Sequence, residues 1–301
     1  MITRNVLVTG GAGFIGSHIV QRLLDLNIKT LVIDDLSTGK LSNMPKGVEF
    51  INLSILDLDK TYLKDVDCVI HLAALSSVPQ SFDYSAETEL VNCHGTEVLL
   101  NSCKEAGVKK VVFASSSSVY GDSQAEKQNE FAEPKPLSPY ALSKLKGERL
   151  CNQYTSCFDV AILRYFNVYG SNQNVNSMYS VAVPSFIDNA RKNLPLTIYG
   201  DGEQTRDFVF VDDVVTATIN ACLSDMVGVY NVGIGIGTSI NTLASTIIWL
   251  LSSDSEIIYE AARKGDPRHT CADIRKLIDS GYVPSCGLRY GLKRTIDGVY
   301  K

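Results

Sequence analysis

The stretch VLVTGGAGFIGSHIV, residues 6–20, decides the fold that we expect. An apolar, β-branched run leads into a glycine-rich turn, and the turn opens directly into a helical pattern. Gly10 permits a tight turn, Gly13 lets the backbone approach a pyrophosphate, and Gly16 lets the helix pack closely on the strand. The free N–H groups and the positive dipole end at the start of the helix favour an anion. The stretch therefore predicts a dinucleotide-binding turn.

A second β-branched run ends in Asp34, at the distance where such turns place an acidic residue. A carboxylate there accepts hydrogen bonds from both ribose hydroxyls and repels a 2′-phosphate. The residues that follow offer no Arg or Lys to receive such a phosphate before Lys40. The sequence therefore predicts NAD, rather than NADP, as the cofactor.

Short β-branched runs alternate with helical patterns through the first half of the chain. The runs are NVLVTG, KTLVID, CVIHLAA, KKVVFASS and VAILRYFNVYG, and the helical patterns span residues 17–26, 91–106 and 139–154. This alternation indicates parallel strands joined by crossover helices, hence an α/β fold with a Rossmann-like, doubly wound sheet.

The pattern becomes more polar after Gly170, with helical stretches at residues 213–223 and 243–251. We expect residues 1–170 to form an NAD-binding domain to which a segment near 208–236 returns. We expect residues 171–301 to form mainly a smaller C-terminal α/β substrate-binding domain.

Composition excludes several classes of function. The chain has 301 residues, 45% of them apolar, and its net charge of −5 is spread without basic or acidic blocks, which argues against nucleic-acid and membrane partners. Its longest apolar run is far shorter than the roughly 18 residues that cross a bilayer, and the first residues enter a strand without a signal peptide, so we expect a cytoplasmic protein. Eight scattered cysteines and four separated histidines predict neither a disulfide framework nor a metal site.

The stretch PLSPYALSKLKGE, residues 136–148, predicts a helix that begins with Ser138 as its N-cap and Pro139 in the first position. Tyr140 and Lys144 stand four residues apart and so share one face of this helix. A phenol, with a pKa of about 10, is a weak base at neutral pH. A nearby ammonium and the positive ring of an oxidised nicotinamide would stabilise the phenolate and lower that pKa. Tyr140 is therefore a candidate general base.

The motifs occur in an order that is characteristic of a known family. They are TGGAGFIGS, HLAA, Asn92, SSSSVYG, YALSK, RYFNVYG and TRDFVFVDDV. The chain resembles, over nearly its whole length, the extended short-chain dehydrogenases/reductases of the NAD-dependent epimerase/dehydratase family that act on nucleotide sugars. Among these it is most similar to the UDP-glucose and UDP-N-acetylglucosamine 4-epimerases.

The resemblance assigns a role to one of the four consecutive serines at residues 115–118. It identifies Ser116 as the hydroxyl that hydrogen-bonds the 4-oxygen of the sugar. Relatives that are 4,6-dehydratases carry Asp-Glu at the next two positions, because expelling the 6-hydroxyl needs an acid and a base, and decarboxylases carry Glu at the second of them. This chain has Ser117 and Ser118 there. A site made of Ser116, Tyr140 and Lys144 can move a hydride and a proton reversibly, which favours a 4-epimerase.

The resemblance implies interconversion of UDP-glucose and UDP-galactose through a transient 4-keto sugar. At the position of Thr270, relatives with a bulky Tyr exclude an N-acetyl group and those with a small residue admit it, so UDP-N-acetylglucosamine and UDP-N-acetylgalactosamine are expected substrates too. Thr270 could instead simply pack. Another nucleotide-sugar epimerase, dehydratase or reductase, and a non-catalytic NAD-bound sensor, remain alternatives.

The resemblance also implies a set of contacts. The residues expected at the cofactor are Gly10, Gly13, Phe14, Ile15, Gly16, Asp34, Asp35, Leu36, Ser37, Thr38, Gly39, Ser54, Ile55, Leu72, Ala73, Ala74, Ser76, Asn92, Tyr140, Lys144 and Phe166. Those expected at the UDP-sugar substrate are Ser116, Tyr140, Asn167, Val181, Ala182, Thr197, Tyr199, Arg206, Arg263, Asp266 and Thr270. Many relatives have Asp where Ser54 stands, which leaves the adenine contact open. A homodimer is expected, in which the helices at 91–106 and 139–154 form a four-helix bundle with their symmetry mates.

Overall fold

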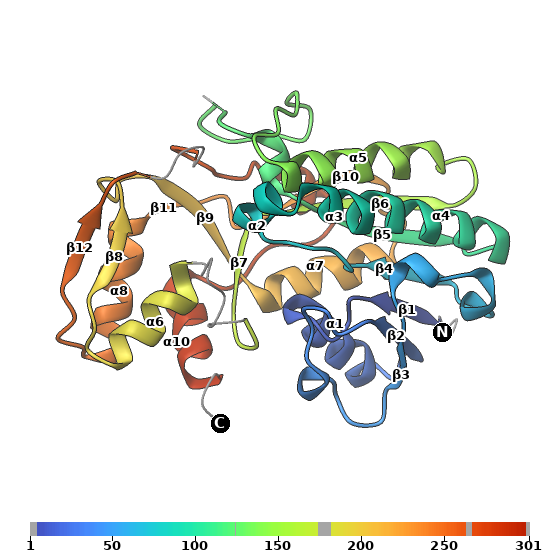
Figure 1. The fold of residues 1–301 in the computed structure, drawn as a ribbon, viewed down its shortest axis with the longest axis horizontal. Coiled ribbons are helices and arrows are strands. Elements are labelled where there is room, and N and C mark those ends of the chain that lie inside the picture. Colours follow the sequence, from blue (N-terminus) through green and yellow to red (C-terminus); the bar gives the residue numbers. More distant parts are fainter. Residues whose placement is uncertain (1–4, 124, 174–181, 263–266, 299–301) are drawn as a thin grey trace.

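A seven-stranded parallel sheet lies at the centre of the computed structural model, which describes residues 5–123, 125–173, 182–262 and 267–298 (Figure 1). Its strands, in the order β10-β6-β5-β4-β1-β2-β3, are β10 (Gly228–Val232), β6 (Asp159–Tyr165), β5 (Lys110–Ser116), β4 (Cys68–His71), β1 (Val6–Thr9), β2 (Thr30–Asp34) and β3 (Glu49–Asn52). The direction of winding reverses between β1 and β4. Ligands of open α/β sheets bind at such a switch point, beyond the carboxyl ends of the strands. The doubly wound sheet predicted from the sequence is confirmed.

Helices cover both faces of this sheet. On one face α1 (Phe14–Asp25) packs against α7 (Val211–Leu223), and on the other α4 (Gly95–Ala106) packs against α5 (Pro139–Gln153) (Figure 1). The strands are therefore apolar on both sides: Val6 and Val8 of β1 belong to the core under α1, and Leu7 belongs to the core under α4.

Short helices lead into α4 and α5. The chain after β4 forms α2 (Val78–Asp83), α3 (Ser85–Glu89) and a π-helical turn η4 (Leu90–His94), and 3₁₀ turns occur at η1 (Leu41–Asn43), η2 (Ile55–Asp57), η3 (Lys60–Leu63) and η5 (Ser117–Tyr120). The helix expected at 91–106 is thus a π-turn followed by α4. In the described ranges no helix is both long and apolar enough to cross a bilayer, and no three His, Cys, Asp or Glu side chains gather as metal ligands could.

A second group of elements stands to one side of the large sheet (Figure 1). It contains the three-stranded sheet β11-β9-β7 and the two-stranded sheet β12-β8, with bounds β7 (Asn167–Tyr169), β8 (Leu196–Tyr199), β9 (Thr205–Phe210), β11 (Gly237–Ser239) and β12 (Ile257–Glu260). The helices of this part are α6 (Ala182–Arg191), α8 (Ile240–Leu251) and α10 (Leu288–Gly298), whereas α9 (Arg275–Asp279) packs on β10 of the large sheet. In the segment expected to return to the first domain, β10 pairs with β6 and α7 packs on α1. The division at residue 170 itself stays a prediction.

Candidate active site

The glycine-rich turn lies between β1 and α1. Gly10 has φ +71°, and a Cβ on it would lie 2.7 Å from the backbone nitrogen of Ala73. A Cβ on Gly16 would collide with the carbonyl oxygen of Gly10. Glycine is required at both positions, by conformation at the first and by close helix packing at the second.

The start of α1 has the properties of an anion site. Gly13 is the N-cap, no side chain caps the helix, and its first turn holds no acidic residue. A Cβ on Gly13 would meet only the Gly10 carbonyl oxygen, at 3.2 Å, so the approach to the helix start is open. The uncapped N–H groups and this open cradle fit a pyrophosphate. Phe14 and Ile15, which follow in the first turn, are half-buried.

Asp34 ends β2 beside this turn. Its Oδ2 accepts a hydrogen bond from the Ala12 nitrogen at 2.9 Å, and its Oδ1 accepts one from the Leu36 nitrogen at 2.8 Å. Burial raises the pKa of Asp34, and these two hydrogen bonds oppose the rise. Each carboxylate oxygen keeps a lone pair for a ribose hydroxyl. Gly39 approaches closely as well, since a Cβ on it would lie 3.0 Å from Asp34 Oδ1.

The remaining cofactor-side residues lie in loops at neighbouring strand ends. Asp35, Ser37 and Thr38 belong to the loop after β2; Leu72, Ala73, Ala74 and Ser76 follow β4; Phe166 is buried after β6. Ser54 caps the 3₁₀ turn η2 by accepting a hydrogen bond from the Leu56 nitrogen. Ile55 is buried and packs against Gly95, where an added Cβ would collide with its side chain.

Asn92 is engaged with the chain itself. Its Oδ1 accepts from the Leu75 nitrogen at 2.8 Å, and its Nδ2 donates to the Leu75 oxygen at 3.0 Å and to Ser143 Oγ at 2.9 Å. Both amide hydrogens are used in holding the loop after β4 on α5. A contact from this side chain to a cofactor would have to use the second lone pair of Oδ1, and it stays a prediction.

The expected catalytic residues come from β5 and α5. Helix α5 begins as predicted, because Ser138 Oγ accepts a hydrogen bond from the Ala141 nitrogen at 3.1 Å and Pro139 takes the first position. The Tyr140 phenol lies close to the Ser116 hydroxyl. Lys144 Nζ donates to the Ala114 carbonyl oxygen at 2.8 Å. All three candidates therefore meet where β5 ends.

Burial dominates the electrostatics of this pair. It raises the pKa of Tyr140, and the nearby Ser116 hydroxyl only opposes the rise. It lowers the pKa of Lys144 to about 8. The expected lowering of the pKa of Tyr140 depends on the Lys144 ammonium together with the ring of an oxidised nicotinamide, and it stays a prediction. Lys144 is directed to a backbone carbonyl, and its buried position weakens its own charged form.

The four serines have different environments. Ser115 Oγ donates to Glu148 Oε1 at 2.5 Å, and Ser116 Oγ accepts from the Ser118 nitrogen at 3.2 Å. The Ser118 hydroxyl is covered and has no partner among the described residues, and Ser117 opens the turn η5.

A buried ion pair that our sequence reasoning missed lies behind this site. Glu148 and Arg164 are each about 4% exposed and share two hydrogen bonds, Nε to Oε1 at 2.9 Å and Nη2 to Oε2 at 2.7 Å. Glu148 stands four residues beyond Lys144, on the same face of α5, and that spacing is the signal that could have revealed it.

The substrate-side residues lie across the smaller sheets. Asn167 begins β7, Ala182 begins α6, Thr197 and Tyr199 belong to β8, and Arg206 is buried in β9. Val181, Arg263 and Asp266 lie outside the described residues. Thr270 is buried, its nitrogen donates to the Thr205 oxygen at 3.1 Å, and its hydroxyl has no partner among the described residues.

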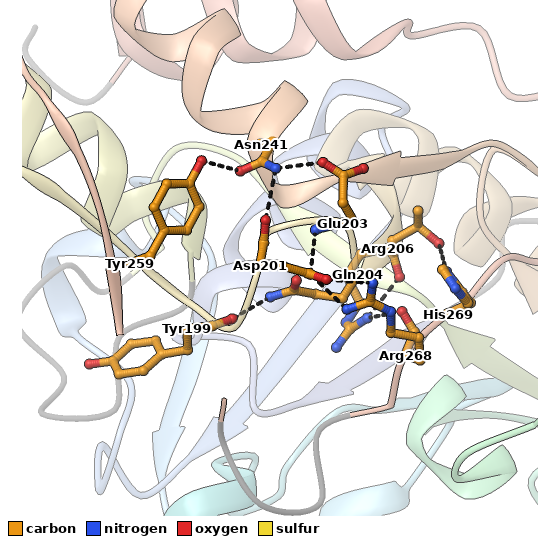
Figure 2. Close-up of polar contacts among 10 residues, drawn as sticks. Tyr199, Asp201, Glu203, Gln204, Arg206, Asn241, Tyr259, Arg268 and His269 are labelled. Carbon is orange, nitrogen blue, oxygen red and sulfur yellow. Dashed lines mark hydrogen bonds and ion pairs between the residues drawn. The ribbon is translucent and has the colours of Figure 1, made fainter. Parts of the chain in front are cut away.

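Figure 2 shows how the segment before Thr270 is attached to the turn between β8 and β9. Arg268 donates to both carboxylate oxygens of Asp201, at 2.7 and 2.8 Å. Arg206 Nη1 donates to the Thr205 oxygen at 2.7 Å, and His269 Nδ1 lies 3.0 Å from Thr205 Oγ1. Asn241 and Tyr259 extend the same network to α8 and β12. The segment that carries Thr270 is therefore hydrogen-bonded to β9 and to the turn before it, and through that turn to β12 and α8.

The NAD dependent epimerase/dehydratase family model matches residues 6–233, which include the glycine turn, Ser116, Tyr140 and Lys144. The chain belongs to this family. NAD is its cofactor, as predicted from the glycine turn and Asp34, and the chain is an NAD-dependent enzyme that modifies nucleotide sugars.

Several known proteins resemble this family member over its full length. It is 39% identical over 298 residues to a putative UDP-glucose 4-epimerase of Methanocaldococcus jannaschii, covering 97% of each chain. The structure of UDP-N-acetylglucosamine 4-epimerase from Methanobrevibacter ruminantium, in complex with UDP-N-acetylmuramic acid, matches with a TM-score of 0.95 at 39% identity, over 99% of this chain and 98% of that one. The Thermus thermophilus UDP-glucose 4-epimerase in complex with NAD matches with a TM-score of 0.91 at 36% identity, over 98% of both. Relatives at 31–34% identity also include decarboxylases and a 4,6-dehydratase.

Proposed function

We propose that this enzyme is a UDP-sugar 4-epimerase, which interconverts UDP-glucose and UDP-galactose and also UDP-N-acetylglucosamine and UDP-N-acetylgalactosamine through a transient 4-keto sugar. The observation that carries the proposal is that the side chains of Ser116 and Tyr140 lie close together at a strand end where the next two positions are serines, not acids. Glu148, the carboxylate bonded to Ser115, is fully paired with Arg164. A buried, bidentate carboxylate of this kind is a poor acid or base for eliminating water.

NAD would be held by the Gly10–Gly16 turn, by Asp34 and by the loops after β2 and β4, and when bound it supplies a hydride acceptor and donor for carbon 4. Tyr140 takes the proton from the 4-hydroxyl and returns it, and Ser116 holds the phenol oxygen and the 4-oxygen together. Since burial raises the pKa of Tyr140, its phenolate needs a positive charge close by, and Lys144 supplies one below its pKa of about 8.

The substrate must be bound mainly through its nucleotide, because the 4-keto sugar has to turn over between the two half-reactions. Arg206, with Asn167, suits the diphosphate, since a guanidinium fork matches phosphate oxygens. Thr197, Tyr199, Val181 and Ala182 are assigned to the uridine, and Arg263 and Asp266 to the ribose and phosphates, on the resemblance alone. The proposed domain roles follow, with residues 1–170 and 208–236 for NAD and most of 171–301 for the nucleotide sugar. A cytoplasmic location also stays a prediction.

We propose that the enzyme is a homodimer. Four large apolar side chains are 41–60% exposed here: Phe82 on α2, Tyr84 between α2 and α3, Leu90 on η4 and Leu142 on α5. Helices α2 and α3 pack against α5. A cluster of exposed aromatic and aliphatic side chains on adjoining helices supports an interface with a second copy. Light scattering at micromolar concentration should give the mass of a dimer, and a monomer mass would contradict it.

Product analysis tests the proposed reaction. Purified enzyme, with no added cofactor, is incubated with the two UDP-hexoses, the two UDP-N-acetylhexosamines, UDP-glucuronate and dTDP-glucose. We expect an equilibrium mixture of 4-epimers from the first four. Release of carbon dioxide from UDP-glucuronate, or a 4-keto-6-deoxy product from dTDP-glucose, would identify a decarboxylase or a dehydratase instead, and a protein that binds NAD but converts nothing would be a sensor.

A further inference from the structure

His71, the last residue of β4, lies buried between hydroxyl groups from two other elements. Its Nδ1 lies 2.7 Å from Oγ1 of Thr9, which ends β1, and its Nε2 lies 3.0 Å from Oγ1 of Thr96 in α4. The three side chains are at most 2% exposed. The chemistry described above gives no role to any of them.

The direction of every hydrogen bond here follows from counting hydrogens. A carbonyl oxygen only accepts, so Thr96 Oγ1 donates its single hydrogen to the Asn92 oxygen at 2.6 Å. The Thr96 oxygen must then accept from His71, which places a proton on Nε2. In the neutral ring Nδ1 is consequently an acceptor, and Thr9 donates to it while accepting from the Ala73 nitrogen at 3.4 Å.

The same chain of bonds continues to the catalytic helix. Asn92 Nδ2 donates to Ser143 Oγ, and the Ser143 hydroxyl donates to the backbone oxygen of Tyr140 at 2.8 Å. Two sets of hydrogen bonds that meet at Asn92, one on its backbone oxygen and one on its side-chain amide, therefore link the end of β1, where the cofactor-binding turn begins, to the residue that we assign as the base. Reversing or removing one link leaves a buried donor or acceptor without a partner, which is costly in a protein interior.

We propose that His71, as the neutral tautomer protonated on Nε2, is a positioning residue that sets the catalytic helix against the cofactor-binding turn. Burial and the charge of Lys144 both disfavour a second proton on the ring, and they lower the pKa of His71 to about 3. The ring is therefore neutral around pH 7. The inference rests on the proposed function only in the assignment of Tyr140 as the base.

Kinetics of His71→Leu test this role, because leucine fills the space but makes no hydrogen bond. We expect kcat for UDP-galactose to fall about tenfold or more with KM nearly unchanged, since a small misplacement of the base costs about that much. Bound NAD per chain should also fall. Ser102→Ala is the matched control, because it removes another buried hydroxyl of α4, which donates to the Leu58 oxygen and takes no part in the bonds of His71. It should leave kcat unchanged. An unchanged kcat and NAD content in His71→Leu would overturn the proposal.

Two further measurements keep the proposal testable if His71→Leu does not fold. Thr96→Val keeps the packing and removes the acceptor of Nε2–H, and it should lower kcat in the same way; wild-type kcat in this variant would overturn the proposal. In wild-type enzyme with bound NAD, nitrogen-15 NMR of the ring should show a protonated Nε2 and a bare Nδ1 around neutral pH. A proton on Nδ1 would contradict it. The NMR result and the NAD content can be read even if the wild type converts no nucleotide sugar, so a failure of the proposed function is distinguishable from a failure of this inference.

Discussion

The side chains of Ser116 and Tyr140, at the end of β5 and in the first turn of α5, lie close together in a buried site. The Ser116 hydroxyl is the chain's own contribution to lowering a pKa of Tyr140 that burial raises. A phenol in this position remains neutral until a positive charge approaches it. The groups that ionise Tyr140 are therefore distinct from those that hold it in place, and different variants test the two.

Tyr140→Phe should keep bound NAD and lose epimerisation by about 10²–10⁴-fold, because it removes the base but little of the cofactor site. The NAD content of the purified variant, measured by absorbance after denaturation, is the control. Turnover close to that of the wild type would eliminate Tyr140 as the base.

The serines should differ in a fixed order. Ser116→Ala should lower kcat by about 10- to 100-fold, equivalent to ~1.4–2.7 kcal/mol of barrier, since it removes the hydroxyl beside Tyr140. Ser115→Ala should lower the melting temperature and leave kcat nearly unchanged, because the Ser115 hydroxyl donates to Glu148 of the buried Glu148–Arg164 pair. Ser118→Ala should change least, because that hydroxyl has no partner to lose among the described residues. If Ser118→Ala were the most damaging, the catalytic hydroxyl would have been assigned to the wrong serine.

The charged Lys144 side chain should lower the free energy of unfolding at neutral pH. Its pKa in the folded chain is about 8, against an ordinary 10.5, so the folded state binds the proton less well than the unfolded state does. The lowered pKa disfavours folding by at most about 3 kcal/mol below pH 8. This destabilisation disappears as pH rises from about 8 towards 10.5. Replacing Lys144 would, in the other direction, remove its hydrogen bond to the Ala114 carbonyl, which is worth about 1 kcal/mol.

We therefore expect Lys144→Met, compared at equal NAD occupancy, to be about 2 kcal/mol more stable than the wild type at pH 7 and to be inactive. Urea unfolding at a series of pH values should show the advantage shrinking above pH 8. A variant less stable than the wild type at pH 7 would show that Lys144 stabilises the fold.

Thr270→Tyr should suppress conversion of the N-acetylated pair and spare the plain hexoses. The added ring would occupy the space through which the acetamido group turns, and overpacking of this kind costs about 1–3 kcal/mol, or one to two decades in rate. Thr270→Val is the control, since the hydroxyl has no partner among the described residues and its loss should change neither activity. Equal loss of both activities in Thr270→Tyr, or a wild type that ignores UDP-N-acetylglucosamine, would mean that Thr270 only packs.

Local sequence features predicted the parts of this molecule that depend on local chemistry. The positive φ of Gly10, the close packing at Gly16 and the Ser138 cap of α5 all follow from residue type and spacing. Helix α2 carries an equally local signal, the cap Ser77 followed by Pro79, but its short length gives no apolar periodicity to extend it.

Contacts between distant segments could not be predicted in this way. The bonds of His71 join residues 62 and 25 positions apart, and no periodicity encodes such pairings. β12 and β8 pair although they lie far apart in the sequence, and neither strand was predicted from the more polar composition after Gly170. The pKa of Tyr140 shows the same limit, because spacing predicts that Lys144 shares its face but says nothing of burial.

Transfer of deuterium tests the central claim most directly. UDP-glucose labelled with deuterium at carbon 4 is incubated with the enzyme in ordinary water, and unlabelled UDP-glucose is incubated in heavy water. If carbon 4 gives up and regains the same hydride, the UDP-galactose formed keeps its label at carbon 4 in the first experiment and takes up no carbon-bound deuterium in the second. Loss of the label, or deuterium from solvent at a sugar carbon, would contradict epimerisation by reversible hydride transfer at carbon 4.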